Sequence, residues 1–166
     1  MDVKEAIEKR KSVRAYSDYE ITQAEFGTLI DAVRLAPTAK NLQPCKLVIV
    51  RGPLVKENLA RACGERMFIA QASAVFCIVV NESISRWTNI DAAIALGHVA
   101  LQAVELGLAT CWIGDFNEEM VKEILKVPAH LKVVALMPIG KAAEDPERRP
   151  RKEAKEFVYY EEFGEN

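Results

Sequence analysis

Two clusters of basic residues near opposite ends of the chain are the strongest candidates for chemistry. Residues 10–14 read Arg-Lys-Ser-Val-Arg, and residues 148–152 read Arg-Arg-Pro-Arg-Lys. Because the termini of a domain commonly lie close together at its surface, both clusters could meet at a single anion. Arginine offers a planar pair of donors and serine a hydroxyl, so Arg10, Ser12 and Arg149 or Arg151 together predict a phosphate site. Taken singly, either cluster would be an ordinary solvated basic face.

Length and charge limit the other possibilities. The chain has 166 residues, half of them hydrophobic, and a net charge of −2. This length favours one domain over residues 1–166, and the charge gives no general attraction to nucleic acid or to an anionic membrane. The first five residues are polar, and the four cysteines form no Cys-x-x-Cys pair. We therefore expect reduced thiols and a cytoplasmic protein.

Hydrophobic periodicity predicts three helices and four strands. Capping patterns at Asp2 with Glu5 and at Thr22 with Glu25 begin the first two helices, and Arg10 falls on the inward face of the first. Alternation of such helices with strands indicates an α/β or α+β fold. The apolar strand candidates are residues 46–51, 75–80, 109–113 and 133–139.

The helix expected over residues 90–106 is the most apolar segment of the chain. Its polar side chains lie along one narrow line, so the helix should be central and covered nearly all round, with His98 a buried, hydrogen-bonded histidine. A membrane span is the weaker alternative, because four polar groups would then lie in lipid. Gly107 should end the helix. The four polar residues are Asp91, His98, Gln102 and Glu105.

Residues 142–166 differ in composition from the rest of the chain. Charged residues and proline dominate as far as residue 156, and four aromatic residues follow over residues 157–163. A free tail has no use for these aromatics, so we expect this extension to pack in a groove or on a partner subunit.

Several common sites are missing from the sequence. It contains no Gly-x-x-x-x-Gly-Lys, no Gly-x-Gly-x-x-Gly and no Gly-x-Ser-x-Gly motif. His98 and His130 are the only histidines, which leaves little for a metal centre or a hydrolytic triad. An organic cofactor that carries a phosphate fits this scarcity, because the cofactor then supplies the chemistry.

Four segments in order resemble the nitroreductase family of FMN-dependent oxidoreductases. They are residues 10–14, residues 36–44 (Ala-Pro-Thr-Ala-Lys-Asn-Leu-Gln-Pro), residues 91–114, which correspond to the central helix and following strand, and residues 138–140 with 151–152. The resemblance implies an α+β fold, a three-layer sandwich with a mostly antiparallel sheet flanked by helices and a long buried central helix. It also implies a homodimer with two FMN sites at the subunit interface, and no metal.

The resemblance assigns roles to individual residues. Arg14 would lie near the pyrimidine edge of the flavin, whereas residues 65–68 lack the second cation that some relatives place near N1. No side chain acts as a base. Arg10, Lys11, Ser12, Arg149 and Arg151 would hold the phosphate; Pro37, Thr38, Ala39 and Asn41 would come from the other subunit; Ile113 and Gly114 would present backbone amides to N5 and O4.

The implied reaction is ping-pong. NADH or NADPH would pass hydride to flavin N5 and leave, and a nitroaromatic, a quinone or a similar acceptor would then take the electrons. Two alternatives stay open: a flavin carrier or sensor without significant turnover, and a thiol enzyme. In the second, Cys45 would be a nucleophile whose pKa is lowered by Lys40 and Lys46.

Overall fold

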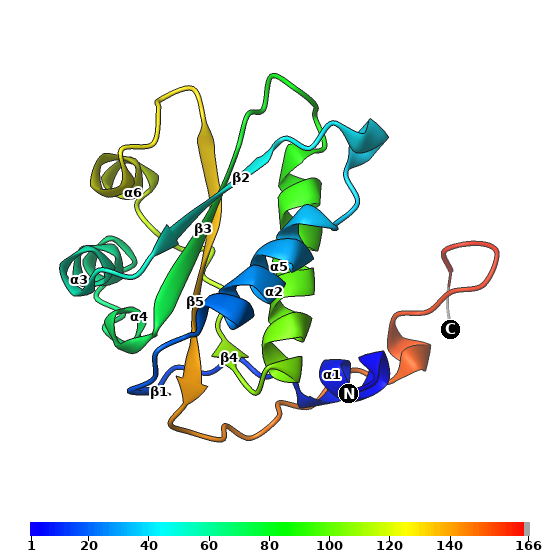
Figure 1. Cartoon of the computed structure of the whole chain (residues 1–166). Coiled ribbons are helices and arrows are strands. Elements are labelled where there is room, and N and C mark those ends of the chain that lie inside the picture. Colours follow the sequence, from blue (N-terminus) through cyan, green and yellow to red (C-terminus); the bar gives the residue numbers. More distant parts are fainter. Residues whose placement is uncertain (165–166) are drawn as a thin grey trace.

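The computed structural model describes residues 1–164, which form three layers (Figure 1). Helices α2 (Gln23–Arg34) and α5 (Thr88–Glu105) cover one face of a central sheet. Helices α3 (Pro53–Ala62), α4 (Phe68–Gln71) and α6 (Glu118–Leu125) cover the other face. The predicted α+β sandwich with helices on both faces is confirmed.

All strand pairs of the sheet are antiparallel, as predicted. The order is β1-β5-β3-β2, with β4 paired to β5. Every residue of β3 is buried, because the strand lies in the middle of the sheet under helices on both sides. The strand predicted over residues 109–113 is shorter than expected, since beyond Thr110 only a single bridge joins Ile113 to Leu136. The strands are β1 (Tyr16–Ser17), β2 (Cys45–Val50), β3 (Ala74–Val80), β4 (Ala109–Thr110) and β5 (Lys132–Ala142).

Both predicted helix starts are confirmed by their capping hydrogen bonds. The Asp2 side chain accepts from the Glu5 amide at 2.8 Å, and Thr22 and Glu25 form a complete capping box. Helix α1 (Val3–Lys9) ends earlier than expected, however, because the backbone of Arg10 is extended (φ −58°, ψ 122°). The expected inward position of Arg10 on a helix face is therefore wrong: Arg10 lies at the helix end and is half-buried.

Helix α5 lies where the sequence placed it, but it is not covered all round. Leu96 and Val99 are fully buried against the sheet, and Gly107 ends the helix with a left-handed backbone (φ +66°), as predicted. On the opposite face Ile90 is 51% exposed and His98 is exposed. The prediction of a buried His98 is wrong for the single chain, because no segment among residues 1–164 covers the side chain of His98.

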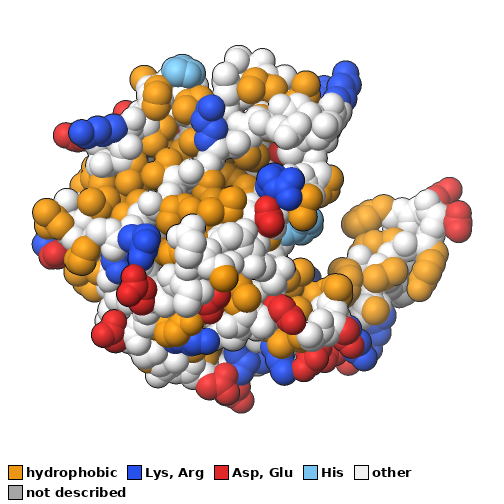
Figure 2. Space-filling view, in the orientation of Figure 1, with side chains coloured by type: hydrophobic (Ala, Val, Ile, Leu, Met, Phe, Trp, Pro, Cys, Tyr) orange, Lys and Arg blue, Asp and Glu red, His pale blue; other side chains and the backbone are white. Residues whose placement is uncertain are grey.

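The C-terminal extension leaves the body of the molecule beside α1 (Figures 1 and 2). A short 3-10 helix, η2 (Ala154–Glu156), precedes aromatic residues that remain open to solvent, with Tyr160 85% and Phe163 88% exposed. The first part of the extension packs on this chain, because the Ala143 amide donates to the Ala15 carbonyl and Arg148 donates to carbonyls at the end of α1. The aromatic residues are not packed in a groove of this chain up to residue 164, and their packing on a partner subunit stays a prediction. The last two residues lie outside the described part. Within the described residues no helix has the length and apolar character needed to cross a membrane.

We expect Gly140→Ala to lower the free energy of unfolding by about 1–3 kcal/mol. A Cβ at this position of β5 would lie 3.1 Å from the amide nitrogen and the Oγ of Ser73, and equally close to Cδ1 of Tyr16. The Ser73 amide belongs to the backbone beside β3 and cannot rotate away. Urea unfolding of the variant against wild type measures the loss.

Gly27→Ala is the matched control, because a Cβ at this exposed position of α2 meets no atom within 4 Å. It should be neutral or stabilising by up to about 1 kcal/mol, since alanine is the better helix former. Equal unfolding midpoints for Gly140→Ala and wild type would contradict the close packing at Ser73.

Candidate functional site

The two basic clusters meet in one pocket, as the sequence predicted. The pocket has a volume of about 360 Å³ and lies between the chain after α1 and the segment after β5. Its charge is strongly positive, because a single acidic residue, Glu147, lies among six basic ones. We call it the basic pocket. It is lined by Arg10, Lys11, Ser12, Arg14, Pro146, Glu147, Arg148, Arg149 and Arg151.

Hydrogen bonds from both ends of the chain hold this pocket together. The Val13 amide donates to the Thr110 carbonyl at 3.0 Å, which fixes the first cluster to β4. Arg148 donates to the Ile7 carbonyl at 3.1 Å and also to the Glu8 carbonyl, at the end of α1 where the helix dipole is negative. Lys11 pairs with Asp145 at 2.6 Å. These contacts explain how segments more than 130 residues apart reach the same anion site.

Some arginines of the basic pocket hydrogen-bond to the protein itself, and others have guanidinium groups left to bind a ligand. The guanidinium of Arg148 is used by the backbone carbonyls of α1. Arg10 and Arg149, by contrast, have no carboxylate within 4.0 Å among the described residues. Unpaired guanidinium groups beside the Ser12 hydroxyl form a donor set that suits a phosphate.

An apolar hollow of about 560 Å³ adjoins the basic pocket. Arg10 and Ser12 line both, so the two form one continuous site. The walls of the hollow come from the exposed face of α5 and from Trp112, which is 42% exposed. A hollow of this size, apolar and adjoining a strongly basic pocket, can receive a flat ring system. Its other residues are Ile7, Ile94, Gly97, His98, Ala100, Leu101, Thr110 and Met137.

A smaller hollow of about 160 Å³ brings Arg14 together with Ile113 and Gly114. The Ile113 amide donates to the Leu136 carbonyl at 2.9 Å, so its hydrogen is already used inside the protein. The Gly114 amide donates no backbone hydrogen bond to any of the described residues. Of the two amides expected to face a ligand, Gly114 is therefore the one left available.

Comparison with known proteins decides the family at this point. The model of the nitroreductase family matches residues 7–141 of the chain. The chain belongs to the nitroreductase family.

Relatives from several bacteria agree with this assignment. The chain is 26% identical to a Bacillus subtilis protein named FMN reductase (NADPH), over 95% of this chain and 72% of the relative. A solved nitroreductase family protein from Clostridium novyi NT is 33% identical, with a TM-score of 0.81 over 99% of this chain and 96% of that one. A solved structure described as an FMN-dependent nitroreductase from Clostridium difficile R20291 is 26% identical, with a TM-score of 0.87 over 95% and 98%.

Arg66 supplies a cation that the sequence reading of this nitroreductase missed. Its side chain lines the same hollow as Arg14, whereas residues 65–68 were expected to provide no second cation. The guanidinium donates to the Cys63 carbonyl and to the Asp115 carbonyl, both at 2.7 Å, and to Asp115 Oδ2 at 2.6 Å. Arg66 thus fixes the turn that carries Gly114. The two contacts to Asp115 join residues 49 positions apart, so no local pattern could reveal them.

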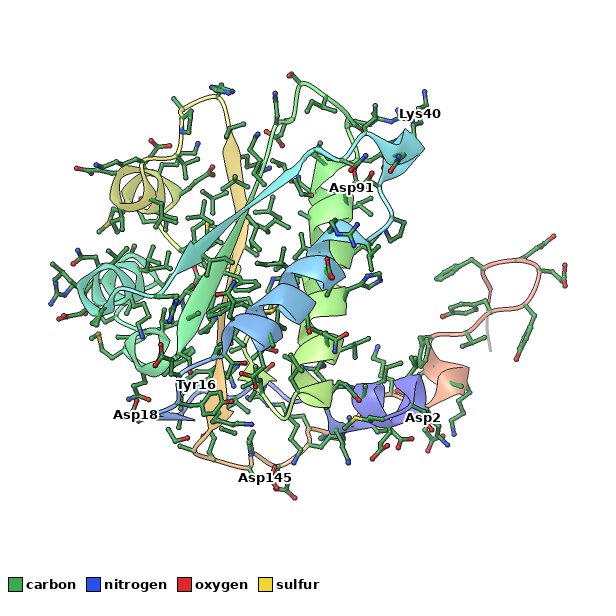
Figure 3. The ribbon with its side chains drawn as sticks, in the orientation of Figure 1. Asp2, Tyr16, Asp18, Lys40, Asp91 and Asp145 are labelled. Carbon is green, nitrogen blue, oxygen red and sulfur yellow. The ribbon has the colours of Figure 1, made fainter. Side chains whose placement is uncertain are left out.

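The loop predicted to border a partner's ring lies apart from the basic pocket. The loop contains the short helix η1 (Ala39–Asn41) and lies at the start of α5 (Figure 3). Its predicted site residues are Pro37 and Thr38, just before η1, and Ala39 and Asn41, within it. The Ala39 amide donates to Asp91 Oδ1 at 3.0 Å. The basic pocket lies beyond the other end of α5, at a distance of about 20 Å along the helix at 1.5 Å per residue. Within one chain these residues therefore do not join the basic pocket.

Asp91 is the anchor of this loop, a role that the sequence reading did not assign. The residue is only 3% exposed, and its second oxygen, Oδ2, is buried without a partner. Lys40, Asn41 and Gln43 all have positive φ angles of 50–55°, which non-glycine residues rarely adopt. The hydrogen bond from the Ala39 amide to Asp91 therefore holds this loop, with its unfavourable backbone angles, against the first turn of α5.

Cys45 is unsuited to the role of nucleophile. Burial and the nearby charge of Asp91 raise the pKa of its thiol to about 11, whereas the sequence reading expected Lys40 and Lys46 to lower it. That expectation is wrong because Lys40 and Lys46 are exposed, while the sulfur is half-buried next to a carboxylate. A raised pKa favours the neutral thiol over the reactive thiolate.

We expect Cys45 to resist alkylation in the folded protein. With a pKa of about 11, roughly one Cys45 thiol in a thousand is ionised at pH 8. Iodoacetamide at pH 8 should therefore leave the native protein unmodified for times that fully alkylate a small free thiol. Intact mass spectrometry measures this, and the same protein in urea, where all four cysteines react, is the control. Rapid single alkylation at Cys45 would contradict the raised pKa.

Proposed function

We propose that this protein is an FMN-dependent oxidoreductase that works as a homodimer and takes reducing equivalents from NADH or NADPH. The observation that carries the proposal is the continuity of the basic pocket with the apolar hollow through Arg10 and Ser12. A phosphate at one end and a flat ring at the other are what such a site accommodates. The names of the FMN-dependent and NADPH-dependent relatives support the same choice.

The residues present fit FMN. Arg10, Ser12 and Arg149 are free to bind the phosphate, and the hollow beside them is apolar. Arg14 places positive charge near Gly114, where it would favour added electron density on a bound ring, whereas the charge of Arg66 is balanced by Asp115. The Gly114 amide would donate to an acceptor at the ring edge. When bound, FMN would supply the hydride chemistry at N5, so the proposed reaction requires no side-chain base.

The second subunit would complete the site. The loop at residues 37–41 cannot reach the basic pocket of its own chain, and the exposed face of α5 is apolar. A two-fold copy packed on this face would bring the loop of one chain to the hollow of the other. The exposed aromatic segment that follows η2 would serve in this arrangement as an arm for the partner subunit.

We further propose a ping-pong reaction that ends on a nitroaromatic, a quinone or a similar acceptor. The hollow is one open space, so the nicotinamide donor and the acceptor would use it in turn. Trp112 and His98 line it with surfaces on which a flat aromatic molecule can stack. Among the described residues, Arg10 is the one Arg, Lys, Asp or Glu that lines the hollow, so its lining would not restrict the acceptor to one compound.

Anaerobic reduction of the purified holoprotein tests the proposal. The protein should be yellow, and NADH or NADPH should bleach it within the dead time of ordinary mixing. A nitroaromatic or a quinone should then restore the colour. Protein that is yellow but unchanged by either nucleotide would be a flavin carrier, and colourless protein that refuses added FMN would contradict the proposal entirely.

A further inference from the structure

Strand β2 forms an open edge of the sheet. It pairs with β3 on one side, and none of the described residues forms a backbone hydrogen bond with its outer side. In an antiparallel pair, every second residue directs its amide and carbonyl away from the neighbouring strand. The outer side of β2 therefore presents a row of unused hydrogen-bonding groups, which is a template for a further strand.

The exposure of β2 comes from this open edge, because helices cover both of its faces. Leu47 and Ile49 pack against the core cluster that α2 and α5 share with the sheet, and Val48 packs against the cluster on the α3 side. Only Val50 of its six residues is nevertheless buried, whereas all seven residues of β3 are buried. Figure 2 shows a band of hydrophobic side chains on the face of the molecule where β2 lies.

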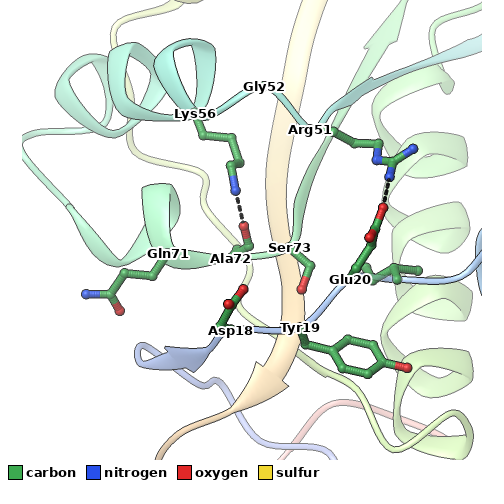
Figure 4. Close-up of a pocket in the computed structure, with 10 residues that line it drawn as sticks. Asp18, Tyr19, Glu20, Arg51, Gly52, Lys56, Gln71, Ala72 and Ser73 are labelled. Atoms are coloured by element: carbon green, nitrogen blue, oxygen red, sulfur yellow. Dashed lines mark hydrogen bonds and ion pairs between the residues drawn. The ribbon is translucent and has the colours of Figure 1, made fainter.

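This edge has little of the protection that natural edge strands carry. Bulges, prolines and charged residues usually prevent an edge from pairing with another chain. Strand β2 pairs with β3 without a shift in register, and Lys46 is its one charged residue. A charged pair occurs only beyond the strand, where Arg51 contacts Glu20 at 2.9 Å (Figure 4). We therefore expect the edge to be covered by another strand.

The end of the extension contains a segment suited to such pairing. Residues 157–160 read Phe-Val-Tyr-Tyr, and aromatic and β-branched residues favour strands. In the single chain these residues form no strand, and the amides of Tyr159 and Tyr160 donate to no backbone carbonyl of the described residues. The segment thus has the composition and the free backbone groups of an added strand.

The extension of a chain is directed away from its own β2. It follows β5, which lies beside β1, and β1 is at the opposite edge of the sheet from β2. Arg148 fixes the extension to the end of α1, and the chain then runs outward from the body (Figure 1). A second copy of the chain offers the same open edge and the same free segment, so a two-fold dimer can satisfy both pairs at once.

The flavin site proposed above brings these two elements towards each other. The loop at residues 37–41, proposed to border the ring bound by the partner, leads directly into β2 at Cys45. The pairing segment follows Arg149 and Arg151, which line the basic pocket. The six residues from Lys152 to Phe157 span at most about 20 Å when extended. The segment of one chain would therefore begin close to the bound FMN that the partner's loop also borders.

We propose that residues 157–160 of one chain pair, as an added strand, with the open edge of β2 in a second copy of the chain. The two subunits thereby exchange arms. Main-chain hydrogen bonds hold each arm, and alternate side chains of the segment cover the hydrophobic band along β2. This inference rests on the proposed dimer and states what the arm binds in the partner.

Hydrogen exchange followed by mass spectrometry tests the proposal on the FMN-loaded full-length protein and on a variant that ends at Glu156. The amides of residues 46–49 should exchange about tenfold faster or more in the shortened variant, because their outer side is then open. The amides of β3 should exchange equally in both proteins, which shows that the shortened chain keeps its fold. The dimer dissociation constant should rise about tenfold or more in the same variant.

A double substitution, Tyr159→Pro with Tyr160→Pro, makes a second test in the full-length chain. Proline has no amide to donate, and two adjacent prolines remove the donor that faces β2 whichever of the two residues supplies it. The variant should expose β2 to exchange as the deletion does. The matched control, Tyr159→Phe with Tyr160→Phe, keeps both amides and both rings, so exchange and dimer affinity should stay within about twofold of wild type.

The outcomes separate this inference from the proposed function. A yellow dimer in which β2 exchanges equally with and without residues 157–166 would overturn the arm exchange and leave the function intact. Loss of protection in the deletion but not in the proline variant would also overturn it, because side chains and not a strand would then hold the arm. A dimer that refuses FMN yet shows both expected differences would support the arm exchange and contradict the proposed function. A full-length protein that is monomeric would overturn both.

Discussion

Arg10→Ala lowers the affinity of the protein for FMN by about ten- to hundredfold. The substitution removes a charge-assisted contact to the phosphate, worth about 1.5–3 kcal/mol. Arg10 is the most informative arginine because it lines both the basic pocket and the apolar hollow and has no carboxylate partner among the described residues. Quenching of FMN fluorescence on titration with apoprotein measures the dissociation constant.

Arg61→Ala is the matched control for this prediction. It also removes one arginine, but from α3 on the other face of the sheet, where the side chain pairs with Glu57 at 2.5 Å. FMN affinity should stay within twofold of wild type. The two variants carry the same net charge, so a general electrostatic effect would weaken both equally. Equal affinities of Arg10→Ala and wild type would remove Arg10 from the proposed phosphate site.

The layers of the fold could be predicted because local patterns determine them. The capping pairs at Asp2 and Thr22 begin their helices as expected, and Gly107 ends α5 with the positive φ that glycine tolerates. The uninterrupted apolar run of β3 identifies a strand buried on both faces. Helices α3, α4 and α6 were missed; α3 and α4 begin without a side-chain cap, so no capping pattern in the sequence marks their start.

The site was predictable to the extent that its residues occur in clusters. Arg10 and Arg149 are each part of a basic run, and the approach of the two termini brought those runs together. The roles of Arg66 and Asp91 could not be predicted from the sequence, for a physical reason. Each acts through a hydrogen bond to a residue 49 or 52 positions away, and nothing in the local sequence encodes such a partner.

The incorrect predictions have two causes: sequence proximity was taken for spatial proximity, and an apolar helix was taken for a covered one. Lys40 and Lys46 are close to Cys45 in sequence, yet the thiol responds to burial and to Asp91. His98 was expected to be buried because its helix is apolar, but in one chain an apolar helix face can remain open. Burial of such a face then requires something outside the chain.

Leu101→Glu is expected to separate the dimer and to abolish FMN retention. Leu101 lies on the open face of α5 and lines the apolar hollow, so the proposed partner would cover it. A carboxylate at this position would be desolvated without a counter-charge in the dimer, yet it remains hydrated in the half-buried environment of the single chain. Size-exclusion chromatography with light scattering gives the mass, and absorbance gives the FMN content of each fraction.

Leu54→Glu is the matched control for Leu101→Glu. It adds the same charge elsewhere on the surface, so it shows whether a new carboxylate by itself disturbs the dimer or FMN binding. Leu54 is 67% exposed on α3, in the layer that is opposite α5. That variant should stay dimeric and yellow, and both variants should keep the helical circular dichroism of wild type. If Leu101→Glu becomes monomeric but keeps FMN, each chain binds FMN without the loop of its partner. If wild type itself is monomeric, the proposed dimer is wrong. The open apolar face of α5 would then have to be covered by another partner or by a ligand, because exposed apolar patches of this kind mark interaction sites.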